Sequence, residues 1–162
     1  MDASALVKHC TQRNITIGSC ESLTAGLFTA SVASIPGASR VLKGGIVTYW
    51  TQIKTDVVHV DPNVIAQEGV ISLACAQEMA QKTRTILDVD YCVSFTGNAG
   101  PDIMENKPAG TVCCAIASKK QVRTYEFHYV GLDRNAVREQ VVNDMIINLI
   151  QVIKEDEENK YA

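Results

Sequence analysis

The sequence predicts one α/β domain, a three-layer α/β/α sandwich built around a mixed sheet. In the first half of the chain, short apolar runs alternate with segments of helical period, the pattern of parallel strands joined by helices. Later, two neighbouring strand-like runs are joined by a short polar turn, which is typical of an antiparallel hairpin. A long amphipathic segment follows. With 162 residues, the chain has room for one domain over residues 1–162 with a sizeable core.

The first half of the chain is expected to hold helices and strands in turn. The predicted elements are a helix from an Asp2 cap to about Arg13, a strand over 15–20, a helix over 22–34, a strand over 42–50 and a short helix over 52–58. Pro36-Gly37 ends the second helix, and Asp61-Pro62 begins a further turn or short helix. Gly44-Gly45 within the second strand indicates a bulge or a close backbone approach.

The second half begins with a helix and ends with one. The predicted elements are a helix over 72–87 capped by Ser72, a strand over 91–96, a loop over 97–110, strands over 111–117 and 121–130 with a Lys119-Lys120 turn, and a helix from near Asp133. The charged tail from about residue 155 is expected to fray. Irregular loops as long as 97–110 are more often functional than not.

Composition excludes several classes of protein. The net charge is −3 and no basic stripe is present, so nucleic-acid binding has little electrostatic support. No apolar run approaches the roughly 18 residues of a membrane span, and the N-terminus lacks the apolar stretch of a signal peptide. We therefore expect a cytoplasmic protein that binds neither nucleic acid nor membrane.

The cysteines give no sign of a disulfide framework or a zinc site. The six cysteines show no CxxC spacing, most lie in apolar segments, and the three histidines are scattered. Reduced thiols and no zinc site are the expectation.

Residues 15–54 carry the strongest chemical signal. A short apolar strand ends where Ser22, Thr24 and Gly26 open a helix. Tyr49 lies near the end of the next predicted strand, and Lys54 lies just beyond it. A helix start offers free N–H groups and the positive end of a dipole. The unit is therefore compatible with an anion site, an activated serine, or both. Glu21 is either a carboxylate favoured by the helix dipole or a group that polarises a substrate.

Six short motifs occur in a recognisable order. They are residues 21–26 (ESLTAG), 36–39 (PGAS), 45–49 (GIVTY) with Lys54, 96–101 (TGNAGP), 107–111 (KPAGT) and 131–134 (GLDR). Together they resemble the CinA C-terminal domain family, whose stand-alone members include nicotinamide mononucleotide deamidases. The likeness covers nearly the whole chain, and it implies an α/β/α sandwich.

The resemblance implies an amidase that hydrolyses nicotinamide mononucleotide to nicotinic acid mononucleotide and ammonia through a serine–lysine pair. On the matched positions, Ser39 is the expected nucleophile, Lys54 its base and Tyr49 a supporting hydroxyl. Thr96 and Arg134 match the family's polar site residues. This scheme requires no metal and no organic cofactor. Homo-oligomers are common for such domains, so we expect a homo-oligomer.

The chemistry of this assignment rests on general rules. A serine needs a base, and a lysine can serve only when burial or a cationic neighbour lowers its pKa. Amide attack builds an oxyanion, which the backbone amides from Gly97 to Gly100 are placed to bind. The substrate phosphate is expected at the helix start formed by Ser22, Thr24 and Gly26, and at Arg134.

Each residue also has an ordinary structural interpretation. Ser22 is a typical helix cap, Ser39 a typical turn residue, Lys54 a typical solvated lysine, and Thr96 a residue that ends a strand. The sequence leaves open which of the two serines is the nucleophile.

Three departures from the family pattern lie where a nucleotide would be bound. Trp50 replaces a common serine, Asn98 replaces an aliphatic residue, and residues 102–106 replace a glycine-rich run. An alternative hypothesis is therefore a nucleotide-binding or interaction module without catalysis. A third is a hydrolase for a different amide.

Overall fold

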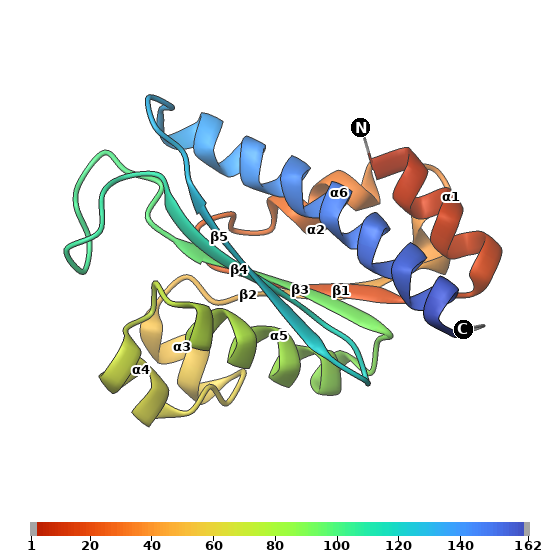
Figure 1. Ribbon diagram of the computed structural model, residues 1–162, viewed down its shortest axis with the longest axis horizontal. Helices are drawn as coiled ribbons and strands as arrows, with labels where there is room; N and C mark the ends of the chain where they lie inside the picture. The colour runs from red at the N-terminus through yellow and green to blue at the C-terminus, as the bar shows by residue number, and fades with distance from the viewer. Residues whose placement is uncertain (1–2, 161–162) are drawn as a thin grey trace.

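The computed structural model describes residues 3–160 and has the predicted three layers, with helices on both faces of a five-stranded sheet (Figure 1). The proposed Asp2 cap lies outside the described residues. The strands lie in the order β2-β1-β3-β4-β5. Their bounds are β1 Ile17–Glu21, β2 Leu42–Val47, β3 Tyr91–Gly97, β4 Thr111–Ala117 and β5 Val122–His128.

The sheet is mixed, as expected. β1 pairs in parallel with β2 on one side and β3 on the other, whereas β3, β4 and β5 pair antiparallel. β4 and β5 form the predicted hairpin, closed by a hydrogen bond from Ser118 N to Gln121 O at 2.9 Å.

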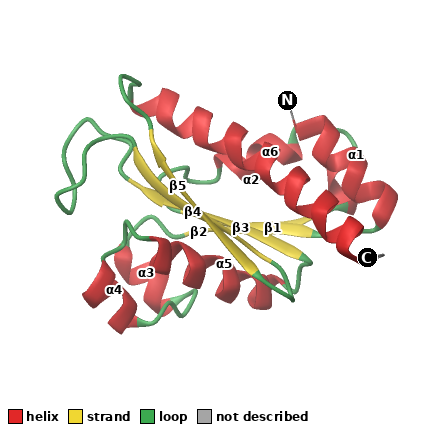
Figure 2. Ribbon diagram, viewed as in Figure 1, coloured by secondary structure: helices red, strands yellow, loops and turns green. Residues whose placement is uncertain are grey.

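Two sets of helices sandwich the sheet (Figure 2). One face carries α1 (Ala3–Arg13), α2 (Leu27–Ala33) and α6 (Arg134–Lys160), and the other carries α3 (Thr51–Asp56), α4 (Pro62–Glu68) and α5 (Leu73–Leu87). A short 3₁₀ helix, η1 (Ala38–Arg40), precedes β2. Within the described chain, no helix is both long enough and apolar enough to cross a membrane.

The core is divided between the two faces of the sheet. The larger part packs α1, α2 and α6 against the sheet around Phe28, Phe95 and Leu149, which are fully buried. The side beneath α5 is made of smaller residues, including Ala76, Ala80 and Cys113 of β4. β4 is buried at all seven positions, because helices cover both of its faces.

Glycines let β2 approach β1 closely. The register shifts between Ile17 and Gly18, whose partners are Leu42 and Gly44, so the irregularity in β2 lies at Lys43, directly before the glycine pair. A Cβ atom at Gly45 would overlap Ser19 Oγ and Thr29 Oγ1, so only glycine fits at this position.

Three element boundaries differ most from the prediction. α2 begins at Leu27 rather than Ser22, because Ala25 (φ 48°) and Gly26 (φ 96°) adopt left-handed conformations that a helix cannot contain. β2 ends at Val47. Instead of fraying, α6 continues to Lys160, and Glu157 in its last turns pairs with His9 and Arg13 of α1.

Candidate active site

The structure brings Ser22 and Lys54 together at one edge of the sheet. Ser22 directly follows β1, and Lys54 lies in α3, which follows β2. Because parallel strands place their carboxyl ends at the same edge, residues far apart in sequence meet there. Lys54 Nζ donates hydrogen bonds to Ser22 Oγ at 3.0 Å and to the Thr48 carbonyl at 2.8 Å.

Burial perturbs the amine of Lys54. The residue is only 2% exposed and Ser22 is 9% exposed. Loss of hydration lowers the pKa of Lys54, because burial disfavours its charged form, while Cys75, Cys20 and Glu105 act in the opposite direction. The lysine is therefore less basic than a lysine in water, and its nitrogen lies within hydrogen-bond reach of a hydroxyl.

The expected pairing of Ser39 with Lys54 is wrong in its geometry. Ser39 lies exposed in η1, before β2 begins, whereas Lys54 follows the end of β2. The six residues of β2 separate the two ends, a span of roughly 20 Å at about 3.3 Å per residue. Ser22 takes the place proposed for Ser39 beside the lysine.

Glu21 occupies the helix start where a phosphate was predicted. Its carboxylate is fully buried and accepts hydrogen bonds from Phe28 N at 2.9 Å and Thr29 N at 3.0 Å. The chain thus supplies its own anion to the first turn of α2, as the dipole interpretation of Glu21 anticipated. An external phosphate on these two N–H groups would have to displace a buried carboxylate.

The remaining residues predicted at this turn lie beside Ser22. Gly26 is the cap residue of α2, so Ser22 itself does not cap the helix. Thr24 is buried, and its hydroxyl has no hydrogen-bond partner among residues 3–160. A buried hydroxyl without a partner is unfavourable in the free protein, and a bound polar ligand would relieve it.

Tyr49 and Arg134 interact with each other. Arg134 donates one hydrogen bond to the Tyr49 hydroxyl at 2.6 Å and another to the Gly100 carbonyl at 2.7 Å. Tyr49 was expected to bond the serine–lysine pair, and Arg134 was expected to bind phosphate. The guanidinium instead links the segment after β2, the loop after β3 and the start of α6.

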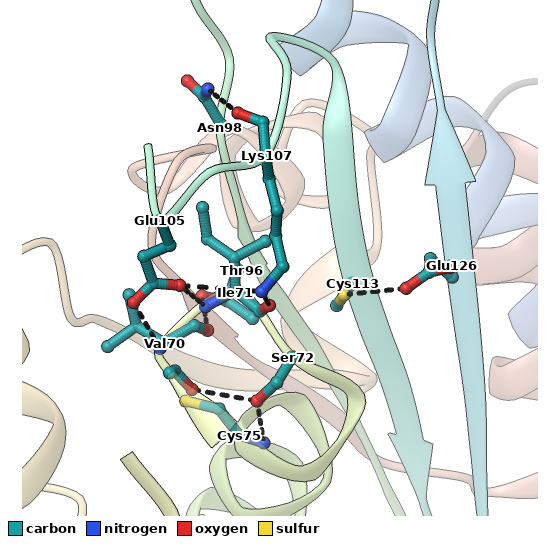
Figure 3. A network of polar contacts seen from close by, with 11 residues as sticks. Val70, Ile71, Ser72, Cys75, Thr96, Asn98, Glu105, Lys107, Cys113 and Glu126 are labelled. Atoms are coloured by element: carbon teal, nitrogen blue, oxygen red, sulfur yellow. Dashed lines mark hydrogen bonds and ion pairs between the residues drawn. The ribbon is translucent and has the colours of Figure 1, made fainter. Parts of the chain in front are cut away.

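The loop over 97–110 is attached to the segment before α5 (Figure 3). Glu105 accepts hydrogen bonds from Val70 N and Ile71 N, both at 2.9 Å, and Lys107 donates to the Ile71 carbonyl. The Thr96 hydroxyl donates to the Val70 carbonyl at 2.7 Å, so this predicted site residue holds the same segment. These contacts fix the loop against the residues that precede α5.

Asn98 organises the start of that loop. Its amide donates to the Asp102 carbonyl at 2.6 Å, and its side-chain oxygen accepts from Gly100 N at 2.9 Å. The Gly100 amide, predicted to bind an oxyanion, is thus already hydrogen-bonded. Gly97 ends β3 and packs against β4, where a Cβ atom would approach the Thr111 carbonyl to 2.7 Å.

Comparisons with known proteins agree with this architecture. The profile of the CinA C-terminal domain matches residues 2–153. The chain belongs to the CinA C-terminal domain family. A relative from Levilactobacillus brevis, provisionally named a competence-damage inducible protein, is 43% identical over 140 residues, which is 86% of this chain and 34% of the relative. A Listeria monocytogenes protein of the same name is 42% identical over 132 residues, 81% of this chain and 32% of that protein. This CinA domain thus spans about a third of the length of the curated relatives it matches.

Solved structures of the family share the fold of this CinA domain. The competence/damage inducible protein CihA from Agrobacterium tumefaciens has a TM-score of 0.89 at 28% identity, and the match covers 92% of each chain. A CinA superfamily protein from Klebsiella pneumoniae has a TM-score of 0.88 at 28% identity, covering 91% of this chain and 92% of that one.

Some features of this CinA domain were outside the reach of the sequence interpretation. The role of Arg138, which holds the carbonyls of the turn after β1, has no local signature, because its partners lie more than a hundred residues away.

Among the described residues, no group of three His, Cys, Asp or Glu side chains is placed to hold a metal ion. All six cysteines are free and buried.

Proposed function

We propose that this CinA domain is an amidase that hydrolyses the carboxamide of nicotinamide mononucleotide, with Ser22 as nucleophile and Lys54 as its base. The observation that carries the proposal is the buried 3.0 Å contact between Lys54 Nζ and Ser22 Oγ. Structural packing alone gives no reason to bury a lysine against a serine hydroxyl, since an unpaired buried cation is costly. The family resemblance supports the nicotinamide nucleotide as substrate.

The reaction would proceed in two halves. Ser22 Oγ attacks the amide carbon while neutral Lys54 takes the hydroxyl proton, and the same proton then leaves with the departing ammonia. The resulting ester is hydrolysed by water, one of whose protons passes to Lys54 and then back to Ser22 Oγ as the acyl–oxygen bond breaks. The carboxylic acid formed gives its proton to solvent and leaves as the carboxylate. Because the base must be neutral, the rate should rise as pH rises through the lowered pKa of Lys54.

A pair of serine variants tests the proposal. Ammonia released from nicotinamide mononucleotide is measured for the native protein, Ser22→Ala and Ser39→Ala. We expect Ser22→Ala to lose at least about 1,000-fold in kcat, because the nucleophile itself is removed. Ser39→Ala is the matched control, since Ser39 is exposed at the far end of β2, and it should retain the native rate. Full activity in Ser22→Ala would reject the mechanism.

A second candidate is a nucleotide-binding module without catalysis. It is favoured by the hydrogen bonds that already engage Arg134 and the Gly100 amide, two groups expected to contact substrate. Thermal unfolding with and without nicotinamide mononucleotide separates the candidates. A pure binder would be stabilised by the nucleotide while releasing no ammonia.

A further inference from the structure

The turn over residues 22–26, which begins with Ser22, has an unusual backbone. Ala25 and Gly26 are consecutive left-handed residues, with φ of 48° and 96°. Residues other than glycine rarely adopt this backbone conformation, and they keep it only where the surrounding structure holds them. The position of Ser22 relative to Lys54 therefore depends on whatever holds this turn.

Glu21 holds the turn from the side of α2. Its fully buried carboxylate accepts hydrogen bonds from the Phe28 and Thr29 N–H groups, from Thr29 Oγ1 at 2.7 Å and from Ser19 Oγ at 2.9 Å. Four donors thus converge on one side chain at the end of β1. The carboxylate joins the residue before the turn to the helix after it, so the two ends of the turn are kept together.

Arg138 holds the turn from the side of α6. Its Nε donates to the Leu23 carbonyl at 2.9 Å and its Nη2 to the Thr24 carbonyl at 3.1 Å, while Nη1 donates to Asn135 on the same helix at 3.0 Å. The rigid planar guanidinium suits two adjacent carbonyls in a way that the single ammonium of lysine does not. These are the carbonyls of the two residues that follow Ser22.

We propose that Glu21 and Arg138 are positioning residues that hold the 22–26 turn from both sides and so place Ser22 Oγ against Lys54 Nζ. Glu21 orders the N–H groups beyond the turn, and Arg138 orders its carbonyls. Both act through the backbone rather than on the reacting atoms. This inference rests on the proposed function, because the position of Ser22 matters chemically only if Ser22 is the nucleophile.

The test compares Arg138→Ala and Arg138→Lys with Arg123→Ala, a matched control on β5 whose side chain bonds Glu155. Two readouts are used: kcat and KM for nicotinamide mononucleotide, and the rate at which phenylmethylsulfonyl fluoride modifies Ser22, followed by mass spectrometry. The second readout reports the reactivity of the serine without any substrate.

We expect Arg138→Ala to lower kcat and the labelling rate by about 10- to 100-fold, since misplacement of a reacting group by about 1 Å has effects of this size. KM should change by less than about threefold, because the contact does not bind substrate. Arg138→Lys should fall between Arg138→Ala and the native protein, and Arg123→Ala should match the native protein. Thermal unfolding of each variant is the check on folding. If the variants unfold at the native temperature, partial unfolding cannot explain lower rates in Arg138→Ala than in Arg138→Lys.

Glu21→Gln provides the second arm. The glutamine has the same size, but its amide N–H₂ would face N–H and O–H donors, so we expect a similar loss of labelling. Labelling at the native rate in both Arg138→Ala and Glu21→Gln would overturn the inference. If the native protein releases no ammonia from the nucleotide, yet Ser22 labelling still falls in these variants, the positioning role is supported and the proposed substrate is rejected.

Discussion

A buried amine is the residue-scale feature on which the proposed chemistry depends. Lys54 is separated from Ser22 by 32 positions in sequence, yet their side chains meet away from water. The sequence did contain the signal, because both residues follow parallel strands. The motif order pointed to Ser39 instead, and only the direction of β2 shows that Ser39 lies at its opposite end.

Lys54→Met should change how stability depends on pH. Burial lowers the pKa of Lys54 in the folded protein from its ordinary value of 10.5. Between the lowered value and 10.5, the unfolded chain binds more protons, so the free energy of unfolding of the native protein rises with pH in that window. We expect Lys54→Met to lack this rise and to be more stable than the native protein below the window.

Urea unfolding at a series of pH values measures this effect. Lys43→Met is the control, because Lys43 is exposed and donates only to the Asp88 carbonyl. Equal pH slopes for Lys54→Met and the native protein would mean that the amine is hydrated in the folded state.

The elements around the site are held by side chain to backbone contacts. Glu21 orders the start of α2, and Glu105 orders the segment before α5. Periodicity predicted which helices exist, but not where α2 begins. Two left-handed residues postpone its start to Leu27, and the capping carboxylate comes from the preceding strand. Such contacts depend on tertiary structure, so local propensity does not report them.

Glu105→Ala should loosen the junction between the 97–110 loop and α5. The variant leaves the N–H groups of Val70 and Ile71 without their carboxylate acceptor. We expect a loss of about 1–2 kcal/mol in the free energy of unfolding, together with faster hydrogen exchange at these two amides. Glu68→Ala, exposed at the end of α4, is the control and should change neither quantity. Unchanged exchange in Glu105→Ala would show that the loop is held by its other contacts.

At the scale of the whole molecule, the sequence predicted the layers and the mixed sheet correctly. Alternating apolar runs indicated the parallel strands, and the polar turn before Gln121 indicated the hairpin. The charged tail was predicted to fray, because its residues are polar on all sides. In the structure its helix continues to Lys160, and Glu157 contacts His9 and forms an ion pair with Arg13 of α1, more than 140 positions away.

Two apolar positions on α6 should show how strongly this helix stabilises the fold. Leu149 is fully buried against the sheet, whereas Ile147 is 37% exposed on the same helix. We expect Leu149→Ala to lower the free energy of unfolding by about 2–5 kcal/mol through lost contacts and a cavity. Ile147→Ala should cost less than about 1 kcal/mol. Urea unfolding measures both, and equal losses would contradict the assigned burial.

The strand order has a consequence for how the polypeptide reaches its native state. β4 and β5 are joined by a short turn. β1 lies between β2 and β3 in the sheet, and β3 begins only at Tyr91, so β1 cannot pair on both sides until that residue has been synthesised. Contacts between distant segments form slowly, because closing a long loop costs entropy. During synthesis on the ribosome, the Ser22 hydroxyl after β1 and the Lys54 amine in α3 therefore gain their final environment late. We expect the proposed activity to be among the last properties that the nascent molecule acquires.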